Sequence, residues 1–212
     1  MRASGATAAL AAASLLLFGC SGLAKLDYKN LFGRDGWQRP TDVIDVLEIP
    51  SGAWVADIGA GKGYFLPHLS RAVGPEGRVF AVEVEDEPLA ALEALISEQG
   101  LANVELLRGR YEDPLLPDRK IDLVLIVNTY HHIEARPDYF GRLRGDLSDT
   151  GRVAVLDPNE ELTGLFSLFL DEGHTSRAAD VREEMREAGY REPESHDFLL
   201  TQIFEVFAPE RP

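Results

Sequence analysis

The sequence is poor in cysteine and in positive charge, and each shortage excludes a class of protein. Cys20 is the only cysteine among 212 residues, so the chain forms no internal disulfide and has no thiol cluster for metal or redox chemistry. Lysine and arginine number 21 against 36 acidic residues, a formal net charge of −15. Because nucleic-acid binding depends on Lys and Arg that replace counterions, we expect no DNA or RNA partner.

Long hydrophobic runs are also missing. The longest, residues 6–18, consists almost wholly of Ala and Leu and is too short to cross a bilayer as a stable helix, but it follows Arg2 with the proportions of a signal peptide. The run leads into Gly19 and Cys20, and this segment resembles the processing box of bacterial lipoproteins, in which the cysteine after the cleavage site is lipidated. The resemblance implies a signal peptide over residues 1–19. We interpret residues 20–39 as a lipidated tether and N-terminal segment that packs on the domain through Leu31, Phe32 and Trp37.

On this interpretation the folded domain is exported and anchored by Cys20 to a membrane of the bacterial cell envelope, on the periplasmic side. The alternative is a cytoplasmic protein whose N-terminus happens to be rich in alanine. The single cysteine gives no independent indication of the redox compartment.

Hydrophobic periodicity from residue 40 onward predicts one α/β domain, residues 40–212. Apolar runs of strand length alternate with longer stretches of helical period, as expected for a doubly wound, mostly parallel sheet covered on both faces. The expected strands are residues 53–58, 78–84, 104–107, 121–127 and 152–156, and the expected helices are residues 40–49, 64–73, 89–99, 138–147 and 177–188. Residues 195–208 alternate apolar and polar side chains, which predicts two short antiparallel strands at the sheet edge.

A glycine-rich turn follows the first expected strand, where ligands bind in folds of this kind. Gly59, Gly61 and Gly63 carry no side chain and let backbone amides approach a ligand closely. A nucleotide-hydrolase phosphate loop requires Ser or Thr after Gly-Lys, and a dinucleotide fold requires glycine where Tyr64 stands. Asp57 would repel a pyrophosphate but attract a ligand that carries an ammonium and a sulfonium, such as S-adenosylmethionine.

Residues 55–64 closely resemble the first motif of the class I S-adenosylmethionine-dependent methyltransferases, and the resemblance extends over residues 40–189. It implies a Rossmann-like fold, S-adenosylmethionine as cofactor, and Glu83 as the acid that holds both ribose hydroxyls. The cofactor-binding residues expected from it are Asp57, Gly59, Ala60, Gly61, Gly63, Glu83, Val84, Tyr111 and Asn128.

The match is weaker after the third expected strand. The family usually has an acid there that contacts the adenine amino group, whereas this chain has Arg110, which accepts no hydrogen bond. Tyr111 covering the adenine ring, Glu112 substituting after a register shift, and a reduced cofactor affinity are the alternatives. We favour Tyr111.

Histidines supply the candidate catalytic groups. His131 or His132, after the fourth expected strand, could act as a general base because imidazole titrates near neutral pH, and we take His131 as the catalytic candidate of the two. Adjacent histidines without a third ligand predict no metal site, and a structural role is expected for at least one of them. Residues 171–176 resemble a segment that approaches the acceptor in methyltransferases acting on quinones and related rings, so His174 is the second base candidate. The apolar residues 162–170 fit either an acceptor-pocket cap or core packing.

The sequence therefore favours methyl transfer to a small or membrane-associated acceptor. The main alternative is a non-catalytic lipoprotein that keeps the fold for ligand binding or scaffolding, since a fold does not determine a function. A nicotinamide oxidoreductase is disfavoured by the glycine spacing. The sequence gives no indication of the oligomeric state.

Overall fold

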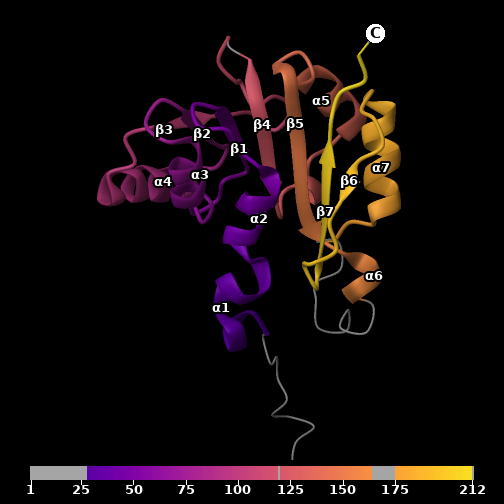
Figure 1. Ribbon diagram of the computed structural model, residues 1–212, viewed down its shortest axis with the longest axis horizontal. Helices are drawn as coiled ribbons and strands as arrows, with labels where there is room; N and C mark the ends of the chain where they lie inside the picture. The colour runs from indigo at the N-terminus through magenta and orange to yellow at the C-terminus, as the bar shows by residue number, and fades with distance from the viewer. Residues whose placement is uncertain (1–27, 119, 164–174, 212) are drawn as a thin grey trace, which may run out of the picture.

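A computed structural model describes residues 28–118, 120–163 and 175–211 (Figure 1). The expected signal peptide, Cys20 and His174 lie outside the described residues, as does most of the apolar segment 162–170. Within the described part of the chain, no helix is long and apolar enough to cross a membrane.

The core is a seven-stranded sheet in the order β3-β2-β1-β4-β5-β7-β6. Its strands are β1 (Trp54–Ile58), β2 (Arg78–Glu83), β3 (Val104–Arg108), β4 (Ile121–Val127), β5 (Leu147–Pro158), β6 (Glu194–Ser195) and β7 (Gln202–Phe207). The first five are parallel, β7 runs antiparallel to β5, and β6 runs antiparallel to β7. The predicted doubly wound sheet with an antiparallel edge is confirmed.

Helices cover both faces of the sheet. They are α1 (Tyr28–Gln38), α2 (Pro40–Leu47), α3 (Leu66–Val73), α4 (Asp86–Gln99), the 3₁₀ turn η1 (Tyr130–His132), α5 (Arg136–Leu143), α6 (Glu160–Thr163) and α7 (Ala178–Glu187). Successive strand residues point to opposite faces. Thus Val55 packs in a cluster with residues of α2 and α3, while Ala56 packs in the other cluster with residues of α5 and α7. Because helices cover both faces of the sheet, the side chains on both sides of these strands are buried, and the strands are continuous apolar runs.

Two regions differ most from the sequence-based expectation. Residues 20–39, predicted as a tether, contain α1, in which two helical pieces meet at a kink at Gly33. The helix expected over residues 138–147 ends at Leu143, and Leu147 already pairs with Ile121 as part of β5. The buried side chain of Leu147 therefore belongs to β5 and not to the preceding helix.

Candidate functional site

A pocket of about 580 Å³ lies at the carboxyl ends of β1, β2 and β4, where the strand order changes direction. In Figure 1 the arrowhead of β5, which is parallel to these strands, points toward the end of the molecule where α1 and α6 lie. The pocket is lined by Arg34, residues 57–62, Tyr64, Phe65, residues 82–85, Arg110, Tyr111, Pro114, residues 127–129, His132, Ile133 and Tyr139. All the predicted cofactor-binding residues except Gly63 are among them.

The glycine turn is held against the neighbouring strands. The amides of Gly59 and Ala60 both donate to the carbonyl of Val82, at 2.9 and 3.1 Å. Gly59 has φ 71°, and a Cβ there would lie 2.3 Å from Cγ2 of Thr129. Glycine is required here both for its backbone conformation and for the close approach of Thr129, in the segment that follows β4. Gly63 instead packs against α4, because a Cβ there would lie 2.4 Å from Cδ2 of Leu95.

Glu83 links the second strand to the turn. One carboxylate oxygen accepts the amide of Gly61 at 2.9 Å, and the other accepts the amide of Val84 at 2.8 Å. Because each carboxylate oxygen accepts two hydrogen bonds, both oxygens keep capacity for hydroxyl donors in the pocket. The side chain is thus fixed in position for a vicinal diol such as that of a ribose.

Asp57 is a carboxylic acid buried in the pocket wall, with an exposed fraction of 3%. Burial raises the pKa of Asp57 to about 7, the neighbouring charge of Glu83 adds to the rise, and the positive charge of Arg34 opposes it. A cation bound beside Asp57 would stabilise its ionised form. The site therefore favours a positively charged ligand.

The remaining predicted cofactor residues line the rim. Asn128 has φ 53°, a conformation that Asn tolerates better than most residues, and its side-chain oxygen accepts a hydrogen bond from Gln202 at 2.7 Å. Tyr111 is 68% exposed, and its hydroxyl bonds Glu85. Arg110 and Tyr111 are among the described lining residues of the pocket, and Glu112 is not.

The adjacent histidines of η1 have different surroundings. Nδ1 of His131 lies 3.0 Å from both carboxylate oxygens of Asp157, and the two side chains are 5% and 0% exposed. The Ser176 hydroxyl donates to the same carboxylate at 2.6 Å. His132 is exposed and lines the pocket, whereas His131 is not among its described lining residues. The structure thus places His131 in a buried network and His132 at the site.

Sequence reasoning missed Arg34, Thr129 and Gln202. Thr129 and Gln202 act through the glycine turn and through Asn128, and no local motif marks such contacts. Arg34 precedes the recognisable motif by more than twenty positions, in a segment without clear period. Leu31, Phe32 and Trp37 are the signal in the sequence that this segment packs on the domain.

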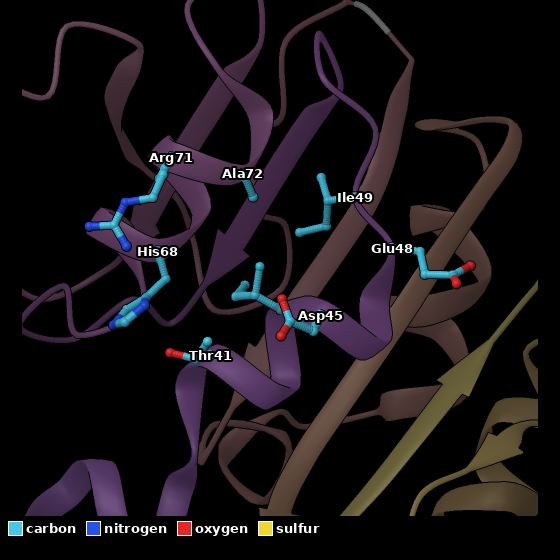
Figure 2. Close-up of a pocket in the computed structure, with 8 residues that line it drawn as sticks. Thr41, Asp45, Glu48, Ile49, His68, Arg71 and Ala72 are labelled. Atoms are coloured by element: carbon cyan, nitrogen blue, oxygen red, sulfur yellow. The ribbon is translucent and has the colours of Figure 1, made fainter.

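A second hollow of about 330 Å³ lies between α2 and α3 (Figure 2). Figure 2 shows Thr41, Asp45 and Glu48 on the side of α2, and His68 and Arg71 on the side of α3. None of the described residues that line this hollow lies at the carboxyl end of a strand. Across the described residues, no group of three or more His, Cys, Asp or Glu side chains is arranged to hold a metal ion.

Comparison with known proteins agrees with this geometry. Residues 55–151 match the family described as "Methyltransferase domain". A solved SAM-dependent methyltransferase from Aquifex aeolicus superposes with a TM-score of 0.72 and 23% identity, and the match covers 87% of this chain and 94% of that one. The solved structure thus shows the fold that the sequence predicts, and residues 55–151 are similar to a methyltransferase domain.

Relatives with named reactions match part of the chain. The ubiquinone/menaquinone biosynthesis C-methyltransferase UbiE of Pseudomonas putida is 27% identical over 136 residues, which are 64% of this chain and 52% of the relative. The aklanonic acid methyltransferase DauC of a Streptomyces species is 32% identical over 119 residues, 55% of this chain and 53% of the relative. The matching part of the chain spans about half the length of these relatives.

Proposed function

We propose that the protein transfers the methyl group of S-adenosylmethionine to a small or membrane-associated ring-type acceptor. The observation that carries this proposal is the pair of buried carboxylates, Asp57 and Glu83, in one pocket around the glycine turn. A ligand with a cationic end and a ribose, and without phosphate, matches this pair. Dinucleotides and nucleoside triphosphates match less well, because their phosphates would lie at the glycine turn beside the carboxylate of Asp57.

The acceptor class is inferred from the rest of the pocket. Val127, Ile133 and Tyr139 give it an apolar wall, and His132 contributes an imidazole. Apolar walls with few polar groups suit a flat, largely uncharged acceptor. The C-methyltransferase relative named for ubiquinone and menaquinone biosynthesis supports an acceptor of this kind.

We assign the general-base role to His132. An acidic ring carbon or a phenol must lose a proton during methylation, and a base acts within hydrogen-bond reach of that proton. His132 lines the pocket, whereas His131, the base favoured from the sequence, is not among its described lining residues. His174, the other predicted base, lies outside the described residues.

Calorimetric titration of the purified full-length protein with S-adenosylmethionine and S-adenosylhomocysteine tests the cofactor site. We expect Asp57→Asn and Glu83→Gln each to weaken binding by about 10- to 100-fold, the effect of losing a hydrogen bond to a charged group. Asp45→Asn, which removes an acid from the hollow of Figure 2, is the matched control and should leave the affinity unchanged. No binding at millimolar ligand would overturn the proposal.

Transfer of a labelled methyl group to a panel of hydroquinones, phenols and primary amines tests the acceptor class. Labelled hydroquinone or phenol is the expected product. Labelling of amines alone would contradict the ring-type acceptor. Cofactor binding without transfer to any panel member would instead favour the non-catalytic alternative.

A further inference from the structure

One of the positively charged side chains that line the pocket is Arg34, and its charge acts on the carboxyl group of Asp57. It belongs to α1, which reaches the carboxyl end of the sheet from outside the strand-and-helix alternation (Figure 1). Arg34 and Asp57 both line this pocket, and the positive charge of Arg34 opposes the rise that burial causes in the pKa of Asp57. This position needs an explanation, because the positive charge of Arg34 would repel the ammonium group that Asp57 is expected to bind.

Its guanidinium is held from two sides. Nε donates to the side-chain oxygen of Gln38 at 2.6 Å, and Gln38 itself is fully buried. Cζ lies 3.9 Å from the centre of the Tyr64 ring, and the Tyr64 hydroxyl bonds Asp35 of the same helix. Within the described chain, no hydrogen bond or ion pair engages the Nη atoms of Arg34. The end of the guanidinium that forms paired hydrogen bonds with carboxylates is thus available in the pocket wall.

The cofactor has a group that matches this donor pair. In the methionyl part of S-adenosylmethionine the ammonium and the carboxylate are bonded to the same carbon atom. A ligand whose ammonium lies against Asp57 therefore brings its carboxylate close by, and a carboxylate left unpaired in a partly buried pocket is costly.

The other cations of the pocket are less suited to this group. Lys62 has a side chain that is 76% exposed and pairs with Glu87 at 3.7 Å. Arg110 follows β3, which the whole width of β2 separates from β1 and Asp57. Among the described pocket cations, Arg34 is the one whose guanidinium neighbouring side chains hold in the pocket wall.

We propose that Arg34 binds the carboxylate of the methionyl part of the cofactor through its Nη atoms, with Gln38 and Tyr64 as positioning residues. The inference rests on the proposed function and deepens it, since it makes the segment before the motif part of the cofactor site. It also makes the site selective for adenosyl ligands that carry a carboxylate.

The test compares two ligands and several variants by calorimetry on the full-length protein. The ligands are S-adenosylhomocysteine and its decarboxylated analogue S-adenosyl-3-thiopropylamine, which keeps the adenosine and the amine. We expect Arg34→Met to weaken S-adenosylhomocysteine binding by about 10- to 100-fold. Its affinity for the decarboxylated analogue should stay within about twofold of the wild-type value, because that ligand makes no contact that depends on Arg34.

Two further variants sharpen the comparison. Arg71→Met removes the same charge from α3, outside the pocket, and should change neither affinity. Arg34→Lys should recover part of the lost affinity for S-adenosylhomocysteine, because an ammonium keeps the charge but not the paired donors. Retained binding of the analogue also shows that Arg34→Met is folded.

The outcomes separate the two proposals. Wild-type binding of S-adenosylhomocysteine that Arg34→Met leaves unchanged, or an equal loss for both ligands, would overturn the carboxylate assignment alone. Failure of the wild-type protein to bind either ligand would overturn the proposed function and the assignment with it.

Discussion

The titration of Asp57 makes the stability of the unliganded protein and the affinity for a cationic ligand depend on pH in opposite directions. Its pKa is raised from 3.8 to about 7 by burial, so the folded state keeps a proton that the unfolded state has already lost in this range. The folded state binds more protons between these values, so the free energy of unfolding falls as the pH rises. A cationic ligand favours the ionised form of Asp57, because it is attracted by the negative charge of the carboxylate.

We therefore predict that the unliganded protein loses stability between about pH 4 and pH 7, with each unit of pKa shift contributing about 1.4 kcal/mol. Chemical denaturation at a series of pH values measures this loss. Asp57→Asn should flatten the profile in this window, whereas Asp45→Asn should not. An unchanged profile in Asp57→Asn would contradict the assigned protonation.

The affinity for S-adenosylhomocysteine should have the opposite dependence. We predict that it rises with pH up to about 7, and that binding below this value releases a proton. Titration in buffers of different ionisation enthalpy counts the proton. Equal affinities at pH 5.5 and pH 7.5 would show that Asp57 does not face the ammonium.

We predict that His131 contributes to the stability of the fold and that His132 contributes to activity. Removing His131 leaves the buried carboxylate of Asp157 short of a partner, so His131→Ala should lower the free energy of unfolding by about 2 to 3 kcal/mol. His132→Ala, at an exposed position, should change stability by less than about 0.5 kcal/mol. It should lower kcat for an acceptor that loses a proton by about 100-fold, with cofactor affinity unchanged. Denaturation and steady-state assays together test both roles, and the reverse pattern would return the base role to His131.

The sequence predicts the two carboxylates but does not separate the two histidines. Asp57 and Glu83 stand at the ends of apolar runs, where parallel strands bring their last residues to one edge of the sheet. The directions of His131 and His132 depend on the turn η1 and on Asp157, which is 26 residues further along the chain. A partner at that distance leaves no local pattern.

At the scale of elements, the contact between the glycine turn and the end of β4 can be tested by adding one methyl group. Gly59→Ala would press a Cβ onto Thr129 in a left-handed backbone conformation. We expect a loss of more than about 2 kcal/mol of stability and at least a tenfold loss of cofactor affinity. Gly100→Ala, with φ 63° and nothing within 4 Å of its Cβ, is the control and should cost about 1 kcal/mol without affecting binding.

Strands were easier to predict than the N-terminal helix. Buried parallel strands are continuous apolar runs bounded by turn residues, so β1, β2 and β4 are visible in the sequence. The helix α1 is kinked at Gly33 and has no sustained apolar period. It is held by single contacts, such as that of Tyr64 with Asp35, which composition does not reveal.

At the scale of the whole molecule, the proposed lipid anchor predicts where the protein is found. We expect metabolic labelling with a fatty acid to label the wild-type chain and not Cys20→Ser, because Cys20 is the only thiol. The wild-type protein should fractionate with membranes, and Cys20→Ser should move to the aqueous fraction. Equal distribution of the two proteins would overturn the anchor.

The antiparallel edge also sets the order in which the molecule is completed. β7 follows every other described strand in the chain, yet it lies between β5 and β6, and Gln202 at its start holds Asn128 at the pocket. A nascent chain on the ribosome therefore lacks this support until residue 207 has been made. We therefore expect the complete pocket to form only after the last strand has been synthesised and has joined the sheet.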